Sequence, residues 1–346
     1  MPWPRPAPAS VRSRPVAARS RARLALAAGA LVALAATAGL SALGESSYLV
    51  RDPAYGDLES RLSAVERTDP APAVFLGTSR VNSGFDAGRG GAFNFGVPGT
   101  GPVTHNIYLR RLIGAGHRPG LLLVEVLPAL VADLGGEPLE ARMTSGSRYT
   151  RDEVDRLAGY GVPRDRLDSQ WRETRTVPWL GLRFQLLGRV APWALPAHLR
   201  HDEGRSGDAR GWRRIPEEVL TPALVAAGRA RARNDYAEVL RTLTPGGPAE
   251  RALRDTVRLA RGHGLRVRLV VMPEAAWFRD LMPAEVGARF DRWLARLASE
   301  EGCPVTDARR WVPDAGFADG HHLLPGGAAA FTDRLAAEVL APEGTP

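Results

Sequence analysis

Two short fragments at opposite ends of the chain carry residues that could together perform acyl transfer. Ser79 follows the apolar run 73–76, and Asp319 and His322 stand three residues apart near the C-terminus. A serine hydroxyl becomes a competent nucleophile when an adjacent base takes its proton, and histidine can serve as that base. A carboxylate fixes the tautomer of the histidine and stabilises its protonated form. These residue types predict a Ser79–His322–Asp319 triad if the fold brings the two fragments together.

A second histidine competes for the role of base. His321 directly precedes His322, but the Asp-x-x-His spacing favours His322, and we interpret His321 as a surface or loop-packing residue. Ser79 also has an alternative role, because a serine after a strand is often the N-cap of the next helix. The order of the fragments along the chain, each after a strand candidate, favours the catalytic interpretation.

The segments between these fragments alternate between strand and helix patterns. Apolar runs predict strands at 73–76, 92–97, 121–127, 267–272 and 305–307, and helical patterns fall at 103–115, 249–263, 283–300 and 326–340. This alternation predicts an α/β fold, with a mainly parallel sheet and helices on both faces. Sites in such folds form at the C-terminal ends of the strands, which is where Ser79 stands.

A glycine-containing loop follows the second predicted strand. The segment 94–99 reads Asn-Phe-Gly-Val-Pro-Gly. Glycine at such a place lets backbone N–H groups approach the oxyanion that develops when a carbonyl carbon is attacked.

These fragments resemble the sequence blocks of the SGNH (GDSL-type) hydrolase superfamily. Gly77-Thr78-Ser79 is similar to the first block, with Thr78 where Asp is common, Asn94-x-Gly96-x-x-Gly99 to the second, and Asp319-x-x-His322 to the fifth. The resemblance covers about 70–135 and 247–340. It implies a flavodoxin-like three-layer fold, Ser79 as nucleophile, Asp319 and His322 as its partners, and the N–H groups of Ser79 and Gly99 as oxyanion donors.

One block of that family has no counterpart in this chain. The family usually carries Gly-x-Asn-Asp after the third strand, and its Asn donates to the oxyanion, whereas residues 124–130 read Val-Glu-Val-Leu-Pro-Ala-Leu. Loss of one donor costs about 10²–10³ in rate. Asn82, Asn94 and Asn106 are candidate replacements, and the sequence does not choose among them. In this departure the chain is similar to membrane-anchored envelope members, such as the D-alanyl transfer protein of lipoteichoic acid synthesis and alginate-type O-acetyltransferase components.

The N-terminal region has the pattern of a membrane anchor. Residues 24–43 carry no charge and no proline, and about twenty apolar residues suffice to span a hydrocarbon core. The preceding residues carry six arginines and no acid, which predicts a cytoplasmic N-terminus. We expect a basic arm at 1–23, a transmembrane signal-anchor at 24–43, a stalk at 44–70 and an extracytoplasmic domain at 71–342. The alternative is a signal peptide that is cleaved to release a secreted protein; its apolar region is usually shorter.

A long insertion, at about 135–246, separates the third and fourth predicted strands. It contains helical stretches and four of the eight tryptophans: Trp171, Trp179, Trp193 and Trp212. We expect it to form a cap beside the C-terminal edge of the sheet. Its tryptophans either stack on sugar rings or pack the insertion itself.

The composition and the absence of certain motifs argue against several other classes of protein. Removing the six arginines of residues 1–23 lowers the formal net charge from +8 to +2, so no nucleic-acid partner is expected. The single Cys303, read as a buried apolar residue, excludes an internal disulfide and a cysteine metal cluster. The chain has no lysine for a phosphate-binding loop and no His-x-x-x-His pair, so we predict neither cofactor nor metal. The nucleophile elbow of α/β-hydrolases needs Gly-x-Ser-x-Gly, and Val81 occupies its second glycine position.

One charged stripe lies outside the candidate site. The arginines at 251, 254, 258 and 261 share one face of a predicted helix, and we interpret them as a solvated surface.

The sequence therefore predicts an extracytoplasmic serine esterase or O-acyltransferase that forms an acyl-enzyme on Ser79. Its substrate would be an acyl ester or an envelope glycan, and a membrane acyl-donor protein is a candidate partner. The alternative from another class is a catalytically inactive scaffold that binds envelope glycan or an assembly partner. The absent Asn block and the tryptophan-bearing insertion motivate that alternative.

Overall fold

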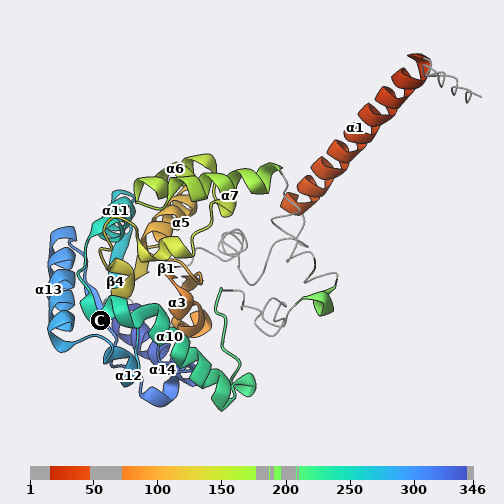
Figure 1. The fold of residues 1–346 in the computed structure, drawn as a ribbon. Coiled ribbons are helices and arrows are strands. Elements are labelled where there is room, and N and C mark those ends of the chain that lie inside the picture. Colours follow the sequence, from red (N-terminus) through yellow and green to blue (C-terminus); the bar gives the residue numbers. More distant parts are fainter. Residues whose placement is uncertain are drawn as a thin grey trace, which may run out of the picture.

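The computed structural model describes residues 16–46, 72–176, 187, 191–195, 208 and 210–340. The predicted stalk at 44–70, the basic arm before residue 16 and Trp179 lie wholly or largely outside these residues. Figure 1 shows the described part as a sheet wrapped by helices, with one long N-terminal helix.

Five parallel strands form the sheet, in the order β2-β1-β3-β4-β5. Their bounds are β1 Ala73–Gly77, β2 Phe93–Gly96, β3 Leu121–Glu125, β4 Arg266–Val271 and β5 Val305–Asp307. All five predicted strands are thus confirmed. The order places β1, the strand before Ser79, in the interior of the sheet with β2 and β3 as neighbours.

Both faces of the sheet are covered, because successive strand residues belong to different cores. In β1, Val74 and Leu76 pack in the core that contains Ile107, whereas Ala73 and Phe75 pack in the core that contains Phe331. This arrangement explains why β1 and β3 read as continuous apolar runs rather than alternating patterns. The predicted α/β fold with helices on both faces is confirmed.

The helices divide between the two faces. One face carries α5 (Pro102–Gly114), α11 (Gly247–Gly262) and α13 (Ala284–Glu301), and the other carries α3 (Ser79–Gly84), α4 (Ala87–Gly90) and α14 (Pro325–Leu335). A π-helical segment, Ala336–Leu340, continues α14. The four predicted helices are confirmed as α5, α11, α13 and α14 with its π-helical extension.

The region between β3 and β4 contains further helices. The longer ones are α6 (Arg151–Gly159), α7 (Arg164–Thr176) and α10 (Pro222–Thr242). Short 3₁₀ segments occur at Pro128–Val131, Leu139–Arg142, Gly146–Arg148, Pro192–Ala194 and Glu217–Val219. Outside this region lie α12 (Ala276–Arg279) and the 3₁₀ turn Asp314–Gly316.

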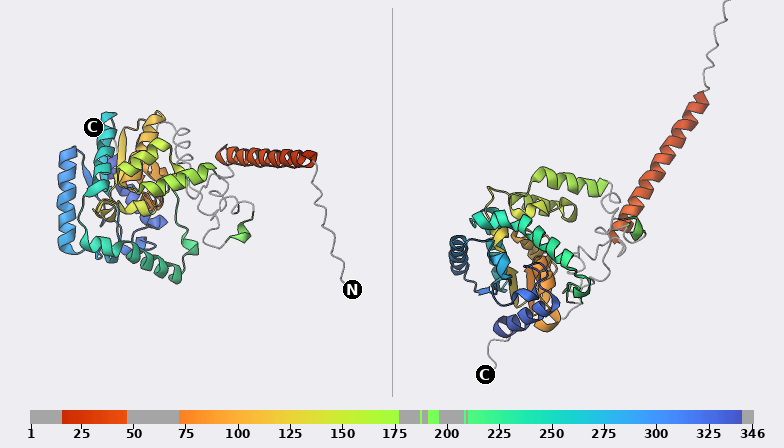
Figure 2. Two further views of the ribbon diagram at one scale, coloured as in Figure 1. Left: turned by 45° about the horizontal axis from the view of Figure 1, so that its top comes forward. Right: turned by 60° about the horizontal axis from the view of Figure 1, so that its bottom comes forward.

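The N-terminal helix α1 spans Val16–Ser46 and is longer than the predicted anchor. Its segment Ser20–Gly39 is long and apolar enough to cross a membrane, and none of that segment is buried in the protein. Figure 2 shows the helix clear of the sheet and its covering helices. Length and composition of this kind are shared by membrane anchors and by signal sequences.

The arginine stripe on α11 is not simply solvated, as the sequence analysis had it. The guanidinium of Arg254 binds Glu250, Glu300 and Glu301, and Arg258 also binds Glu301, at 2.6–2.9 Å. The carboxylate of Glu301 is nearly buried and belongs to α13. These arginines therefore tie α11 to α13. Cys303, in contrast, is buried as expected, and burial raises the pKa of its thiol.

Candidate active site

The turn after β1 presents Ser79 at the first position of α3. Thr78 is the N-cap of this helix, and its Oγ1 accepts a hydrogen bond from the N–H of Arg80 at 3.1 Å. The capping role considered for Ser79 therefore belongs to Thr78. The Ser79 hydroxyl points away from that cap and is only partly buried.

Gly77 lets α3 start immediately after the strand. A β-carbon at this position would lie 2.2 Å from the side chain of Val81 and 2.8 Å from a carboxylate oxygen of Glu125. No larger residue fits without moving the helix, so the glycine keeps Ser79 close to the C-terminal end of the sheet.

The Asp319–His322 loop connects the 3₁₀ turn Asp314–Gly316 to α14. Gly320 adopts a positive φ of 96°, and a β-carbon there would lie 2.2 Å from the Trp277 ring. Within the loop, one oxygen of Asp319 accepts hydrogen bonds from the N–H groups of His321 and His322, at 3.3 and 3.0 Å. These bonds hold the carboxylate in place relative to the following histidines.

The structure brings the three predicted residues into one hydrogen-bonded chain. His322 Nε2 lies 2.7 Å from Ser79 Oγ, and His322 Nδ1 lies 2.8 Å from Asp319 Oδ2. Asp319 only accepts hydrogen bonds when ionised, so Nδ1 carries the proton and Nε2 is free to accept the serine O–H. This is the geometry in which a histidine acts as general base for a serine.

Asp319 is suited to remain ionised. Burial alone would raise the pKa of its carboxyl, but the hydrogen bond from His322 and the charges of His322 and His321 together lower it well below the usual range. An ionised Asp319 stabilises the imidazolium that forms when His322 takes the serine proton.

His321 does not contact Ser79 in the same way. Its ring is buried, stacks on Phe278 with centroids 5.0 Å apart and meets Tyr236 edge-on at 5.4 Å. Its Nδ1 lies 3.3 Å from Asp319 Oδ1. Burial lowers the pKa of His321, which favours the neutral ring. The geometry assigns the base position to His322 and a packing position to His321.

The predicted oxyanion donors come from two backbone positions. The N–H of Ser79 belongs to the first turn of α3, where a helix offers no carbonyl partner. Gly99 has a positive φ of 74°, in the turn that follows β2. That turn is fastened to the end of β1, because the carbonyl of Gly77 accepts bonds from Val97 N–H at 2.8 Å and Thr100 Oγ1 at 3.3 Å.

Two of the three candidate asparagines are committed elsewhere. The Asn94 Nδ2 donates to the carbonyls of Val81 and Phe85, both at 2.8 Å, and its Oδ1 accepts from Gly96 N–H at 2.9 Å. Its amide therefore braces α3 against β2. These bonds argue against Asn94 as an oxyanion donor.

Asn106 lies between helices. Its Nδ2 donates to Thr256 Oγ1 at 3.2 Å, and its Oδ1 accepts from Arg110 Nε at 2.9 Å. This places the side chain at the contact of α5 with α11, which argues against a role at the oxyanion. Asn82, three residues after Ser79 on α3, stays a predicted donor.

β3 ends in a buried glutamate. The resemblance would place an oxyanion-binding asparagine after this strand. Glu125 is the last residue of β3, and its Oε2 accepts the N–H of Thr78 at 2.6 Å. Leu127, two residues further on, is buried in the apolar cluster beneath α10. In the sequence, Glu125 stands out only because it interrupts an apolar run. A charged residue inside a strand expected to be buried was the signal that could have marked it as part of the site.

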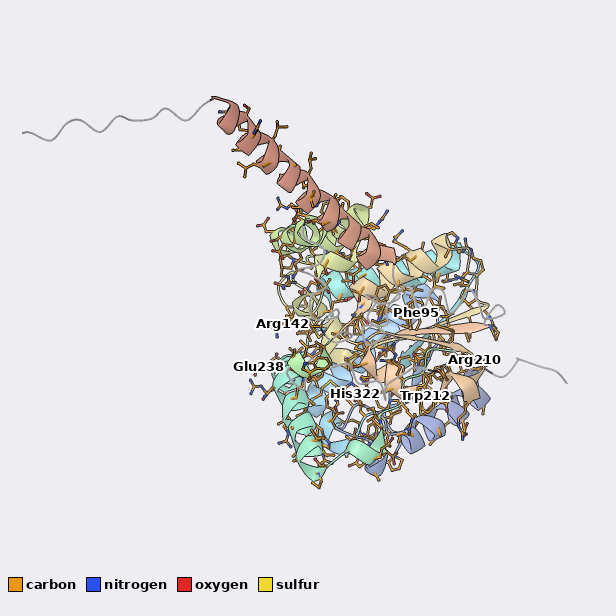
Figure 3. The ribbon with its side chains drawn as sticks, turned by 90° about the vertical axis from the view of Figure 1, so that its right-hand side faces the viewer. Phe95, Arg142, Arg210, Trp212, Glu238 and His322 are labelled. Carbon is orange, nitrogen blue, oxygen red and sulfur yellow. The ribbon has the colours of Figure 1, made fainter. Side chains whose placement is uncertain are left out.

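Parts of the insertion lie directly against the site. On α10, a β-carbon at Gly228 would be 3.0 Å from Cβ of Asp319, and Tyr236 meets His321. From the segment before α10, Trp212 Nε1 donates to the carbonyl of Ser83 at 2.9 Å. Figure 3 shows Trp212 and His322 on the same side of the molecule. The insertion was expected to form a cap beside the C-terminal edge of the sheet, and α10 is the helix of the insertion that lies against Asp319 and His321.

The tryptophans of the insertion divide by environment. Trp171 packs against the core beneath α6 and α7, Trp212 packs against the core that contains Phe331, and Trp193 is 75% exposed. Packing is thus the observed role for Trp171 and Trp212.

Donor atoms of Asp319, His321 and His322 lie within 4.8 Å of one another, close enough to bind a metal ion. Both ring nitrogens of His322 are already engaged, one with Asp319 and one with Ser79. A metal bound through His322 would therefore break the hydrogen-bonded chain, and the donor set fits the triad better.

No protein-family model and no curated protein match this sequence. One similar solved structure is a crystal structure of a putative acylhydrolase from Bacteroides fragilis, with 13% sequence identity, a TM-score of 0.38, and coverage of 84% of this chain and 99% of that chain. A similarity at this level carries no argument about activity, so the functional conclusion rests on the geometry of the site.

Proposed function

We propose that this protein is a serine esterase or O-acyltransferase of the SGNH type. The observation that supports it best is the chain of two short hydrogen bonds from Ser79 through His322 to Asp319. A purely structural serine would not require a histidine at 2.7 Å whose second nitrogen is held by an ionised carboxylate.

In the proposed reaction, Ser79 Oγ attacks the carbonyl carbon of an ester while His322 Nε2 takes the serine proton. Asp319 stabilises the resulting imidazolium, and the N–H groups of Ser79 and Gly99 stabilise the oxyanion. Collapse of the tetrahedral intermediate breaks the ester bond, and His322 donates its proton to the departing alcohol. An acyl group then remains on Ser79.

The second half-reaction decides between esterase and transferase. His322 removes a proton from water or from a sugar hydroxyl, which attacks the acyl-enzyme and releases Ser79. An envelope glycan is the proposed acceptor in the transfer case, with a membrane protein supplying the acyl donor. This part of the proposal derives from the sequence resemblance and from the apolar helix α1.

The direct test of the proposed chemistry is covalent labelling. We expect a fluorophosphonate to modify the native protein on the peptide that contains Ser79, and the native protein to cleave a simple aryl acetate. Heat-denatured protein is the control, because labelling must depend on the assembled site. If the native protein neither labels nor cleaves the ester, the inactive scaffold becomes the better description.

We also propose that α1 anchors the domain outside the cytoplasm. The basic residues before its apolar segment favour a cytoplasmic N-terminus. A reporter enzyme that is active only outside the cytoplasm, fused after residue 346, should therefore be active in cells, and a reporter active only inside should be silent. The reverse pattern would reject this topology. Membrane extraction with carbonate would separate a retained anchor from a cleaved signal sequence.

A further inference from the structure

A buried cluster of one arginine and two glutamates lies beneath the nucleophile turn. Arg80, the residue after Ser79, is only 1% exposed and is among the largest fully buried side chains of the described residues. Its neighbours Glu125 and Glu274 are 2% exposed each. Burying charges is costly unless they pair with one another, so such a cluster needs a reason to exist.

Arg80 is held on several sides. Its Nη1 lies 3.3 Å from Glu274, and its Nη2 donates to the carbonyls of Met272 and Pro273 at 3.0 and 2.9 Å. Those three acceptors are the residues that directly follow β4, so Arg80 fastens α3 to the segment at the C-terminal end of that strand.

Glu125 connects this cluster to the backbone beside the nucleophile. One carboxylate oxygen lies 3.6 Å from Arg80 Nε, and the other accepts the Thr78 N–H at 2.6 Å. Thr78 is thereby fixed twice, since its own Oγ1 caps the N–H of Arg80. Glu274 approaches Nη1 of the guanidinium, whereas Glu125 approaches Nε and also binds the N–H of Thr78.

We propose that Glu125, at the end of β3, is a positioning residue for the nucleophile turn through its hydrogen bond with the N–H of Thr78. Fixing the N–H of Thr78 fixes the Gly77–Thr78 peptide, one peptide before the one that carries the Ser79 N–H. It thereby limits movement of the turn that presents the Ser79 hydroxyl and its N–H. The proposal rests on the proposed function in taking Ser79 as the nucleophile. It assigns the end of β3 a task in this chain, where the resemblance leads one to expect an oxyanion-binding asparagine.

Glu125→Ala and Glu274→Ala form a matched pair for the test. Each variant removes one buried carboxylate and leaves Arg80 with the other, so both should lower the melting temperature. Only Glu125→Ala removes the acceptor for Thr78 N–H. We expect kcat for aryl acetate to fall by about 10–100-fold in Glu125→Ala with little change in KM, because small displacements of reacting groups cost that much. Glu274→Ala should retain kcat within a factor of about three.

A second readout does not depend on catalysis. Amide hydrogen exchange of the peptide spanning residues 74–84 should accelerate in Glu125→Ala at least tenfold more than in Glu274→Ala. If the native protein does not cleave esters, the proposed function fails. The positioning role of Glu125 is then judged on the exchange rates alone. Equal exchange and equal kcat in the two variants would overturn the proposal.

The glutamine variants cover the case in which an alanine variant does not fold. Glu125→Gln keeps an oxygen that can accept the Thr78 N–H but removes the charge that faces Arg80. We expect it to retain most of the exchange protection of residues 74–84 and most of kcat, as does Glu274→Gln. If Glu125→Gln lost protection as fully as Glu125→Ala, the charge and not the contact with Thr78 would be the important feature, and the proposal would be wrong.

Discussion

Replacing Ser79 by alanine should lower ester hydrolysis by about 10⁴–10⁶-fold and abolish fluorophosphonate labelling. Removing the nucleophile from a serine-histidine pair costs about as much as removing the whole triad, because the parts act as one unit. The prediction rests on the 2.7 Å contact with His322, which makes Ser79 the proposed nucleophile. Hydrolysis of an aryl acetate and the mass of the labelled peptide measure the two effects.

The matched control is Ser83→Ala. Ser83 lies one turn further along α3, and its Oγ donates to the carbonyl of Ser79 at 3.0 Å. It shares the helix and the neighbourhood of Ser79, and its hydroxyl bonds to a backbone carbonyl and not to a described histidine. We expect this variant to label at close to the native rate. Labelling that persisted in Ser79→Ala, or vanished only in Ser83→Ala, would show that the nucleophile had been misassigned.

The two adjacent histidines should differ sharply in their effect on activity. We expect His322→Gln to lower kcat by about 10⁴-fold or more, because glutamine cannot take the serine proton. His321→Gln should lower kcat by no more than about tenfold, since His321 packs on Phe278 and Tyr236 and does not reach Ser79. Steady-state kinetics on both variants, with melting temperatures to confirm folding, measure the difference.

The loss of stability should be larger in His321→Gln than in His322→Gln, the reverse of the order expected for the loss of activity. His321 is 6% exposed and stacked between aromatic rings, whereas His322 is partly exposed. The melting temperature should therefore fall more in His321→Gln than in His322→Gln. A large loss of kcat in folded His321→Gln with native-like activity in His322→Gln would exchange the roles assigned to the two residues.

The fold was largely predictable because its strongest signals are local. The strands of the sheet are buried on both faces, which produces continuous apolar runs such as 121–124. The spacing of Asp319 and His322 was readable for a similar reason, since one short loop carries both residues. The contact of that loop with Ser79 followed from the rule that sites form at the C-terminal ends of parallel strands.

What escaped prediction depends on long-range contacts. The sequence could not show that Asn94 braces backbone carbonyls while Asn82 remains a candidate donor, because an amide serves either role equally well. Likewise α10 carries an ordinary mixture of Ala and Arg, and only its packing against Asp319 through Gly228 shows its importance. The pairing of the α11 arginines with Glu301 also required knowledge of where α13 lies.

Ser79 and His322, which share one hydrogen bond in the candidate site, stand 243 residues apart in the sequence. A chain is synthesised from its N-terminus, so Ser79 emerges long before the loop that carries His322. Until α14 packs and seats that loop, the hydroxyl has no base beside it and remains as unreactive as any free serine. A nascent chain that ends before this loop therefore lacks the partner of Ser79, and the hydrogen-bonded chain can form only after the loop and α14 have folded.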